Sequence, residues 1–326
     1  MKGKMLFAIC GGTVLSCSVM AEEIKLPPPA FYGNLNFGGL KIESQDADMQ
    51  SFQLELGLKG VVNITEQKVL YEVAVDFSDA VNNSDNSGSD EVHVKQAKMI
   101  VPTRYGTLIL APRTSSGQWM DIYHPVFGVY DYNIARANNA PGGVADGIFA
   151  QNDRASSVLA YATPNVLGHW KLVGSVLTLK HDNDEDFDAK AVRAVYHDGK
   201  LHFALGSTLT EAKMLPTSED YYRHVASVSY SWDALTLGAI YEHNDRHPSG
   251  DFDAYGANAT YRLPAGYSVS VGYKEKNHDK DELDNSAVVA RVAKDLNQYL
   301  TVWAETGQYD ELDDNNNYAA GLKFRF

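Results

Sequence analysis

The sequence predicts an all-β chain that crosses a membrane as a closed antiparallel barrel of about sixteen strands, with a long third loop folded into the lumen. Segments of about ten residues alternate between apolar and polar side chains, which is the period of a β-strand. Their connections are alternately short and long, and the chain ends on one more such segment. After the N-terminal residues no apolar run is long enough for a membrane helix, so only a closed barrel satisfies the backbone in lipid.

The first 21 residues have the features of a secretory signal peptide. Lys2 and Lys4 form a basic region, an apolar stretch follows at 5–14, and Ala21 ends the small residues before the expected cleavage. We therefore expect residues 1–21 to be removed during export.

The remaining chain, 22–326, is expected to form one barrel domain. Cys10 and Cys17 both lie in the signal peptide, so the exported chain needs no disulfide; a lipoprotein signal at 14–17 is a weaker alternative.

The formal charge is -14, and losing the two signal-peptide lysines makes it more negative, which argues against a nucleic-acid partner. The mean hydropathy of -0.30 suits a barrel, in which every second strand residue faces lipid.

Sixteen strands are expected, with no helix between them. In chain order they span 30–42, 51–62, 68–78, 91–102, 107–116, 154–163, 169–180, 188–197, 200–210, 221–231, 234–243, 252–262, 267–275, 286–294, 298–309 and 317–326. The short connections contain the residues that tight turns require, whereas the long ones, such as 82–90 and 276–285, are polar and mostly acidic.

The second predicted strand illustrates the alternation. Phe52, Leu54, Leu56 and Leu58 share one expected face, and Gln53, Glu55, Gly57 and Lys59 share the other. A soluble β-sandwich also alternates, so this pattern alone does not establish a membrane barrel. The 19 tyrosines, many of them near strand ends, favour the barrel because aromatic rings form girdles at both lipid boundaries.

The connection 117–153 is the longest, and it is rich in aromatic and aliphatic residues where the other long connections are acidic. A segment so apolar is expected to fold inward and pack on the barrel wall. It would then narrow the lumen and bring Asp121, Asp131 and Asp146 toward the aqueous path. The alternative is an external lid or a contact between subunits.

The last nine residues are expected to form one strand with an apolar face and a polar face, ending in Phe326. This segment resembles the closing strand of an outer-membrane barrel, in which an aromatic terminus is also the signal for membrane insertion. Gly321, Phe324 and Phe326 match that signal, whereas Ala319 stands where a polar residue is usual. The alternative is an ordinary edge strand.

Several motifs resemble, in order, those of the general trimeric porins of Gram-negative outer membranes. They are LGLKG at 56–60, YGTL at 105–108, PVFG at 125–128, RASS at 154–157 and YATP at 161–164. The resemblance covers nearly the whole exported chain. It implies a sixteen-stranded barrel, a third loop that forms the constriction, and a homotrimer.

In that family, basic wall residues face acidic loop residues across the constriction. Arg113 and Arg154 match two of the wall positions. The sequence departs from the family at Glu55, where many relatives have an arginine, and at Val126, where an acidic loop residue is usual. These departures make Asp131 the expected loop carboxylate and predict a weak preference for cations.

The predicted function is passive diffusion of ions and small hydrophilic solutes across the outer membrane, with lipids and lipopolysaccharide as neighbours. Two alternatives remain open: a sugar-selective porin, with Trp119, Tyr123 and Tyr130 as a stacking track, and a non-conducting barrel that acts as a receptor or adhesin. No enzymatic site, cofactor or metal is expected. The acidic stretch 182–188 lacks the glycine and the closing glutamate of a calcium loop.

Overall fold

The computed structural model describes residues 28–326 except 44, 65, 83–91, 135–146, 179–186, 213–214, 216–217 and 311–315. The predicted signal peptide, residues 1–21, lies outside the described residues. So do Asp146 and most of the acidic stretch 182–188.

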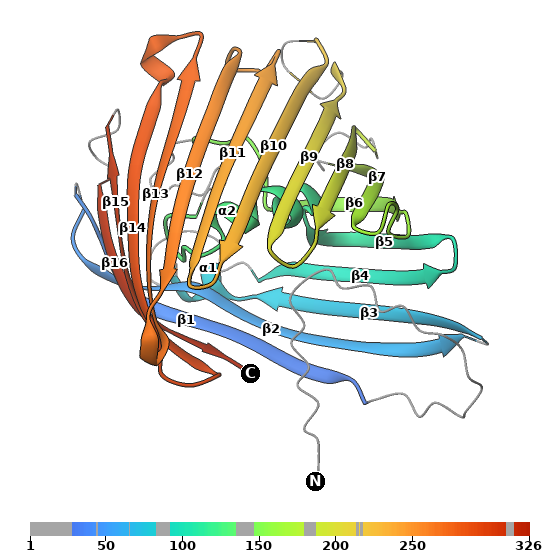
Figure 1. Ribbon diagram of the computed structural model, residues 1–326, viewed down its shortest axis with the longest axis horizontal. Coiled ribbons are helices and arrows are strands. Elements are labelled where there is room, and N and C mark those ends of the chain that lie inside the picture. The colour runs from blue at the N-terminus through green and yellow to red at the C-terminus, as the bar shows by residue number, and fades with distance from the viewer. Residues whose placement is uncertain are drawn as a thin grey trace.

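Sixteen antiparallel strands form one closed barrel in which β1 pairs with both β2 and β16 (Figure 1). The strands are β1 (Ala30–Ile42), β2 (Asp48–Ile64), β3 (Gln67–Asp76), β4 (His93–Thr103), β5 (Gly106–Ser115), β6 (Arg154–Ala162), β7 (Trp170–Thr178), β8 (Ala189–His197), β9 (Leu201–Thr210), β10 (Tyr221–Trp232), β11 (Leu235–Asp245), β12 (Phe252–Arg262), β13 (Tyr267–His278), β14 (Asn285–Asp295), β15 (Leu300–Tyr309) and β16 (Asn317–Arg325). Every predicted strand is present, with boundaries that differ by a few residues. The predicted fold class is confirmed.

The expectation of no helix between the strands is wrong. Short helical elements occur at α1 (Ser78–Asn82), η1 (Trp119–Tyr123), α2 (His124–Phe127), η3 (Pro264–Gly266) and η4 (Asp281–Leu283). The Asp76 side chain accepts the backbone N–H of Ser78 at 3.0 Å, as a residue preceding a helix often does. Among the described residues, no helix is long and apolar enough to cross a membrane.

The barrel wall has one apolar and one polar face. On β16, Tyr318, Leu322 and Phe324 are exposed, whereas Asn317 and Ala319 on the other face are buried. The same alternation continues around the barrel, where exposed Val, Leu and Tyr side chains recur at every second position. We call the side with these exposed residues the apolar face and the opposite side the polar face.

β-Bulges interrupt this alternation on neighbouring strands. Phe52 is skipped in the pairing of β2 with β1, and its ring packs on Trp303 at 5.0 Å between centroids. The expectation that Phe52 shares a face with Leu54 is therefore wrong, because a bulge inserts one residue and turns its side chain. Lys95 is skipped in the same way against β3, and Pro112, which has no N–H to donate, falls in the bulge of β5 against β4.

Candidate functional site

The described parts of the long connection, 117–134 and 147–153, pack against the polar face of the wall. Trp119, Tyr123, Val126, Phe127 and Tyr130 are buried and form one apolar cluster with wall residues of β8 to β14. Their spacing of three and four residues is that of one face of a helix, which explains why this stretch is helical. The sequence contains this period, so the expectation of a connection without helix is wrong for 119–127.

Wall glycines make room for this segment. A Cβ atom on Gly256 of β12 would lie 2.5 Å from the ring of Phe127, and one on Gly206 of β9 would lie 2.6 Å from Ile122. Both positions must therefore lack a side chain for the segment to approach the wall this closely.

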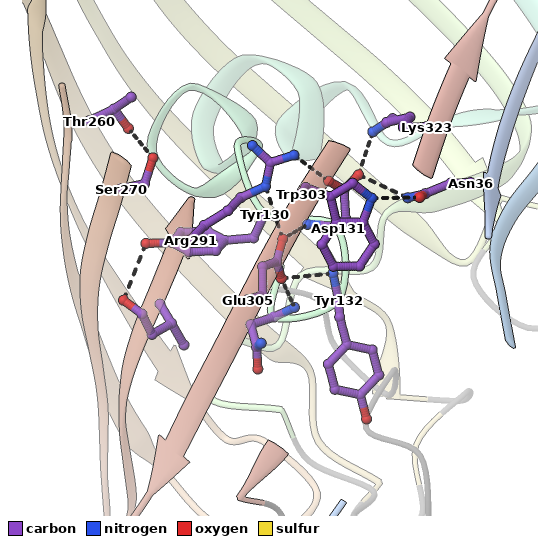
Figure 2. A network of polar contacts seen from close by, with 12 residues as sticks. Asn36, Tyr130, Asp131, Tyr132, Thr260, Ser270, Arg291, Trp303, Glu305 and Lys323 are labelled. Carbon is purple, nitrogen blue, oxygen red and sulfur yellow. Dashed lines mark hydrogen bonds and ion pairs between the residues drawn. The ribbon is translucent and has the colours of Figure 1, made fainter. Parts of the chain in front are cut away.

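Glu305 of β15 anchors the segment through its backbone (Figure 2). Its carboxylate accepts the N–H groups of Asp131, Tyr132 and Asn133 at 2.5, 3.0 and 3.1 Å. The Glu305 side chain is fully buried, with Arg291 Nε 3.2 Å from it. Three consecutive donors converging on one carboxylate fix the backbone of the segment against the wall.

Asp131 adds a second, ionic anchor at the same place. Its carboxylate lies 2.6 Å from Arg291 and 2.5 Å from Lys323, and it accepts a hydrogen bond from Asn36 at 3.1 Å (Figure 2). Burial by itself would raise the pKa of Asp131, but Lys323 and Arg291 hold it below its usual range. The side chain is only 3% exposed, so this carboxylate anchors the segment and does not face an open path, contrary to expectation.

A further anchor holds the segment at β10 and β11. Buried Glu242 accepts the hydroxyl of Tyr123 and, at 2.8 Å, the N–H of Ala150. Arg223 donates to the carbonyl of Ala150 at 3.1 Å and to the side chain of Gln151 at 2.7 Å. Burial and the negative charge of Glu242 raise the pKa of Tyr123, so its hydroxyl remains a donor.

Asp121, in η1, pairs with the wall at β8 and β9. Its carboxylate lies 2.5 Å from Arg193 Nε, and its carbonyl oxygen is 2.6 Å from His202 Nε2. The Asp121 side chain is 32% exposed, about a third, which is far more than Asp131. Among the predicted loop carboxylates that the structure describes, Asp121 is therefore the more accessible.

The predicted wall residues Glu55, Arg113 and Arg154 lie together with Asp76 and Lys95 on β2 to β6, in a group that we call the wall cluster. Lys95 Nζ lies 2.8 Å from Glu55 and 3.8 Å from Asp76, and Arg154 lies 3.2 Å from Asp76. Arg113 donates to Ser156 on the neighbouring strand. Lys95 and Asp76, which the sequence did not predict as site residues, thus link Glu55 to Arg154.

The wall cluster is close to neutral. Glu55 is buried, and Lys95 compensates its charge. Lys95 lies at a β-bulge, so the alternation of strand residues does not predict which face it occupies. Arg154 also lies 3.8 Å from Asp153, which adds a third carboxylate beside three cations. Glu55 therefore does not present the uncompensated negative charge on which the predicted cation preference depends.

The structure also corrects the expectation of an aromatic track. The rings of Trp119, Tyr123 and Tyr130 are at most 4% exposed. Trp119 stacks on Tyr123 at 5.9 Å between centroids, and the Tyr130 hydroxyl donates to Asn258 at 2.9 Å. These rings are used in packing the segment to the wall, so none offers a free face to a sugar.

Two residues of the predicted insertion signal, Gly321 and Phe324, lie on the closing strand β16, and Phe326 directly follows it. The Phe324 and Phe326 rings are exposed on the apolar face, 5.6 Å apart, and Phe326 exchanges two backbone hydrogen bonds with Gly33 of β1. Gly321 lies against Trp303 and the backbone of Phe37, where a side chain would not fit. This placement shows how the terminus closes the barrel, and its role in insertion stays a prediction.

A closed antiparallel barrel with an apolar outer band is the architecture of a multi-pass outer-membrane protein. The sequence profile of the Gram-negative porin family matches residues 6–317. The chain therefore belongs to the Gram-negative porin family, whose barrels form outer-membrane channels for solutes. Comparison with curated protein sequences gave no match.

Solved structures with the same fold include an anion-selective porin from Comamonas acidovorans, with a TM-score of 0.73 and 12% identity over 91% of this chain and 99% of that chain. Another is OmpF of Salmonella typhi in complex with daunomycin, with a TM-score of 0.71 and 12% identity over 91% and 97%. A third is the trimer form of OmpT, an outer membrane protein of Vibrio cholerae, with a TM-score of 0.66 and 14% identity over 91% and 99%. At these identities the likeness concerns the fold alone.

Proposed function

We propose that this porin is a passive channel for ions and small hydrophilic solutes, narrowed by the segment 117–153 and weakly selective for cations. The observation that carries the proposal is the anchoring of residues 117–134 on the polar face. Their contacts run from β8 around to β16 and β1, which is consistent with a segment inside the closed wall. The remaining polar wall, including the wall cluster, then borders the path of the solute.

The test is the current through purified, refolded protein in a planar bilayer. Stable ohmic steps would support the channel. A folded barrel without conductance would overturn the proposal and favour a receptor or adhesin.

The cation preference rests on the negative charge of the whole chain, -14, and on the partly exposed carboxylate of Asp121. It no longer rests on Glu55, which Lys95 neutralises. A salt gradient across the bilayer tests it, because the sign of the reversal potential reports which ion permeates faster. An anion-selective sign would keep the channel and show that the wall arginines dominate the path.

We further infer a homotrimer that contacts outer-membrane lipid and lipopolysaccharide through its apolar face. Large apolar side chains are exposed there on β1 to β5, among them Phe31, Met49 and Leu56. One solved structure of the same fold is described as a trimer form. Native mass spectrometry in detergent, with N-terminal sequencing, tests both the trimer and the cleavage after Ala21.

A further inference from the structure

Three ionisable side chains interrupt the apolar face of the barrel on the neighbouring strands β10, β11 and β12 (Figure 1). They lie side by side, because His224 pairs with His243 and His243 pairs with Asp253 across the strands. Farther along the same strands this face exposes Val228, Leu237 and Tyr255. Ionisable groups on the face that an outer-membrane barrel turns to lipid cost free energy, so three together call for a functional explanation.

The group lies near the rim that carries the longer connections. The connection 246–251 follows directly on the end of β11, whereas β10 and β11 are joined at the opposite rim by only two residues, 233–234. His224 is exposed, and the side chains of His243 and Asp253 are 43% and 36% exposed. A dissolved ion therefore reaches the group from outside the barrel, without entering the lumen.

Asp253 fixes the orientation and the tautomer of His243. Its carboxylate accepts a hydrogen bond from Nδ1 of His243 at 2.8 Å and another from the hydroxyl of Tyr241 at 2.8 Å. The proton of the neutral His243 ring is therefore on Nδ1, which leaves the lone pair of Nε2 available. Histidines that bind metal ions commonly donate their other N–H to a carboxylate in this way.

His224 places a second imidazole beside the first. The rings of His224 and His243 are nearly parallel, with 6.5 Å between centroids and 9° between planes. Residues directly opposite in an antiparallel pair have Cβ atoms about 4.5–5.5 Å apart, and a bond from zinc to an imidazole nitrogen is about 2.0–2.1 Å long. The two side chains can therefore share one ion once the exposed ring of His224 turns to another rotamer.

The chemistry of two imidazoles defines the class of ion. Imidazole suits Zn²⁺, Cu²⁺ and Ni²⁺, whereas Mg²⁺ and Ca²⁺ prefer oxygen ligands. No three His, Cys, Asp or Glu side chains of the described chain form a group that could hold a metal ion, so water would complete the coordination here. The sequence did not predict this pair, because strand pairing brings the two rings together and their spacing along the chain does not.

A second pair of opposite histidines offers an internal comparison. His197 and His202 pair across β8 and β9, with 5.7 Å between ring centroids. There Nε2 of His202 is engaged by the carbonyl oxygen of Asp121 at 2.6 Å, so that ring is held toward the segment 117–153.

We propose that His224 and His243 bind one divalent transition-metal ion, represented by Zn²⁺, on the outer face of the barrel, and that Asp253 positions His243 for it. The site lies outside the lumen, so it does not rest on the proposed function.

Calorimetric titration with Zn²⁺ tests the site in refolded protein without a polyhistidine tag, at about pH 7.5, where an imidazole is neutral. His224→Gln should weaken the binding by at least about tenfold, because it removes a ligand. Asp253→Asn keeps both imidazoles and should still weaken binding by about tenfold, since carboxylate partners of metal-binding histidines typically contribute at least that much. His197→Gln is the matched control and should bind Zn²⁺ as the native protein does.

Electron paramagnetic resonance with Cu²⁺ in place of Zn²⁺ reports the ligands directly. At one equivalent of Cu²⁺ the native protein should show coupling to two imidazole nitrogens, and His224→Gln to one. Coupling to a single imidazole in the native protein, or equal Zn²⁺ affinity of the native, His224→Gln and Asp253→Asn proteins, would overturn the site and show binding by isolated surface histidines only.

Circular dichroism of each variant checks that the barrel is intact, and all three substituted side chains are at least partly exposed. A barrel that binds Zn²⁺ at this pair without conducting ions would support the site and overturn the proposed function. A conducting barrel whose Zn²⁺ binding is insensitive to His224→Gln would do the reverse.

Discussion

Glu305 holds the backbone of the segment 117–153 against the wall at residues 131–133. It accepts three consecutive N–H groups and also pairs with Arg291. We expect Glu305→Ala to release residues 131–133 from the wall, because removing one partner of a buried charged network costs on the order of 3–5 kcal/mol. Limited proteolysis in this segment and noisier single-channel current would report the release.

Glu305→Gln is the informative comparison for this prediction. It keeps the shape and one acceptor oxygen but loses the charge, so it should retain part of the anchoring. If Ala and Gln variants both behave as the native protein, the carboxylate does not position the segment.

Asp131 gives the same anchor a defined pH dependence. Its pKa is held below the usual range, so the charged form contributes stability above the ordinary value of about 3.9 and loses it only as the pH falls through the lower folded value. We therefore expect the loss of anchoring at 131–134 that comes from Asp131 to occur only in strong acid, as a rise in hydrogen exchange relative to intrinsic rates. In Asp131→Asn this strong-acid step should be absent, and equal acid-induced rises in the native protein and in Asp131→Asn would contradict the assignment.

At the scale of the element, the wall glycines decide whether η1 and α2 can dock. Gly256→Val should push Phe127 from the wall, at a cost of about 1–3 kcal/mol for overpacking. Gly174→Val is the control, because a Cβ atom at Gly174 of β7 meets nothing within 4 Å. We expect faster proteolysis of 117–134 in the first variant only; similar proteolysis of both variants would count against a docking role for the glycine.

The elements show what a period of two can and cannot predict. Strand positions followed from it because each strand repeats the same alternation, and Tyr318 and Ala319 lie on the expected faces. The face of Phe52 did not follow from this alternation, because a bulge adds one residue to the strand and the composition does not indicate where the bulge lies. Lys95 was missed for the same reason.

The candidate site was less predictable than the wall, because its partners are far apart in sequence. The alternation of strand residues predicted that Glu55 lies on the polar face. No local feature of the sequence, however, connects Glu55 to Lys95 or Asp131 to Lys323. The helical spacing from Trp119 to Tyr130 was a readable signal, since a buried face repeats every three or four residues. It indicated packing, and an aromatic track was the wrong interpretation of it.

At the scale of the whole molecule, the question is whether ion selectivity reports total charge or the charge beside the path. Lys95→Gln and Lys190→Gln distinguish the two, because each removes one positive charge. Lys95 lies in the wall cluster, whereas Lys190 pairs with Glu211 at 2.8 Å and is 57% exposed. Lys95→Gln leaves Glu55 uncompensated at a buried site, where desolvation strengthens the field of its charge. Lys190→Gln leaves Glu211 without this partner at an exposed site, where solvent and salt screen its charge.

We expect the reversal potential of Lys95→Gln to shift toward cations and that of Lys190→Gln to remain close to the native value. Charge near a narrow path acts on every permeating ion, whereas a charge more than about 10 Å away is screened at ordinary salt. Equal shifts would show that total charge sets selectivity. No shift in Lys95→Gln would mean that permeating ions pass too far from the wall cluster to sense it, and the path would then be sought along Asp121 and Arg193.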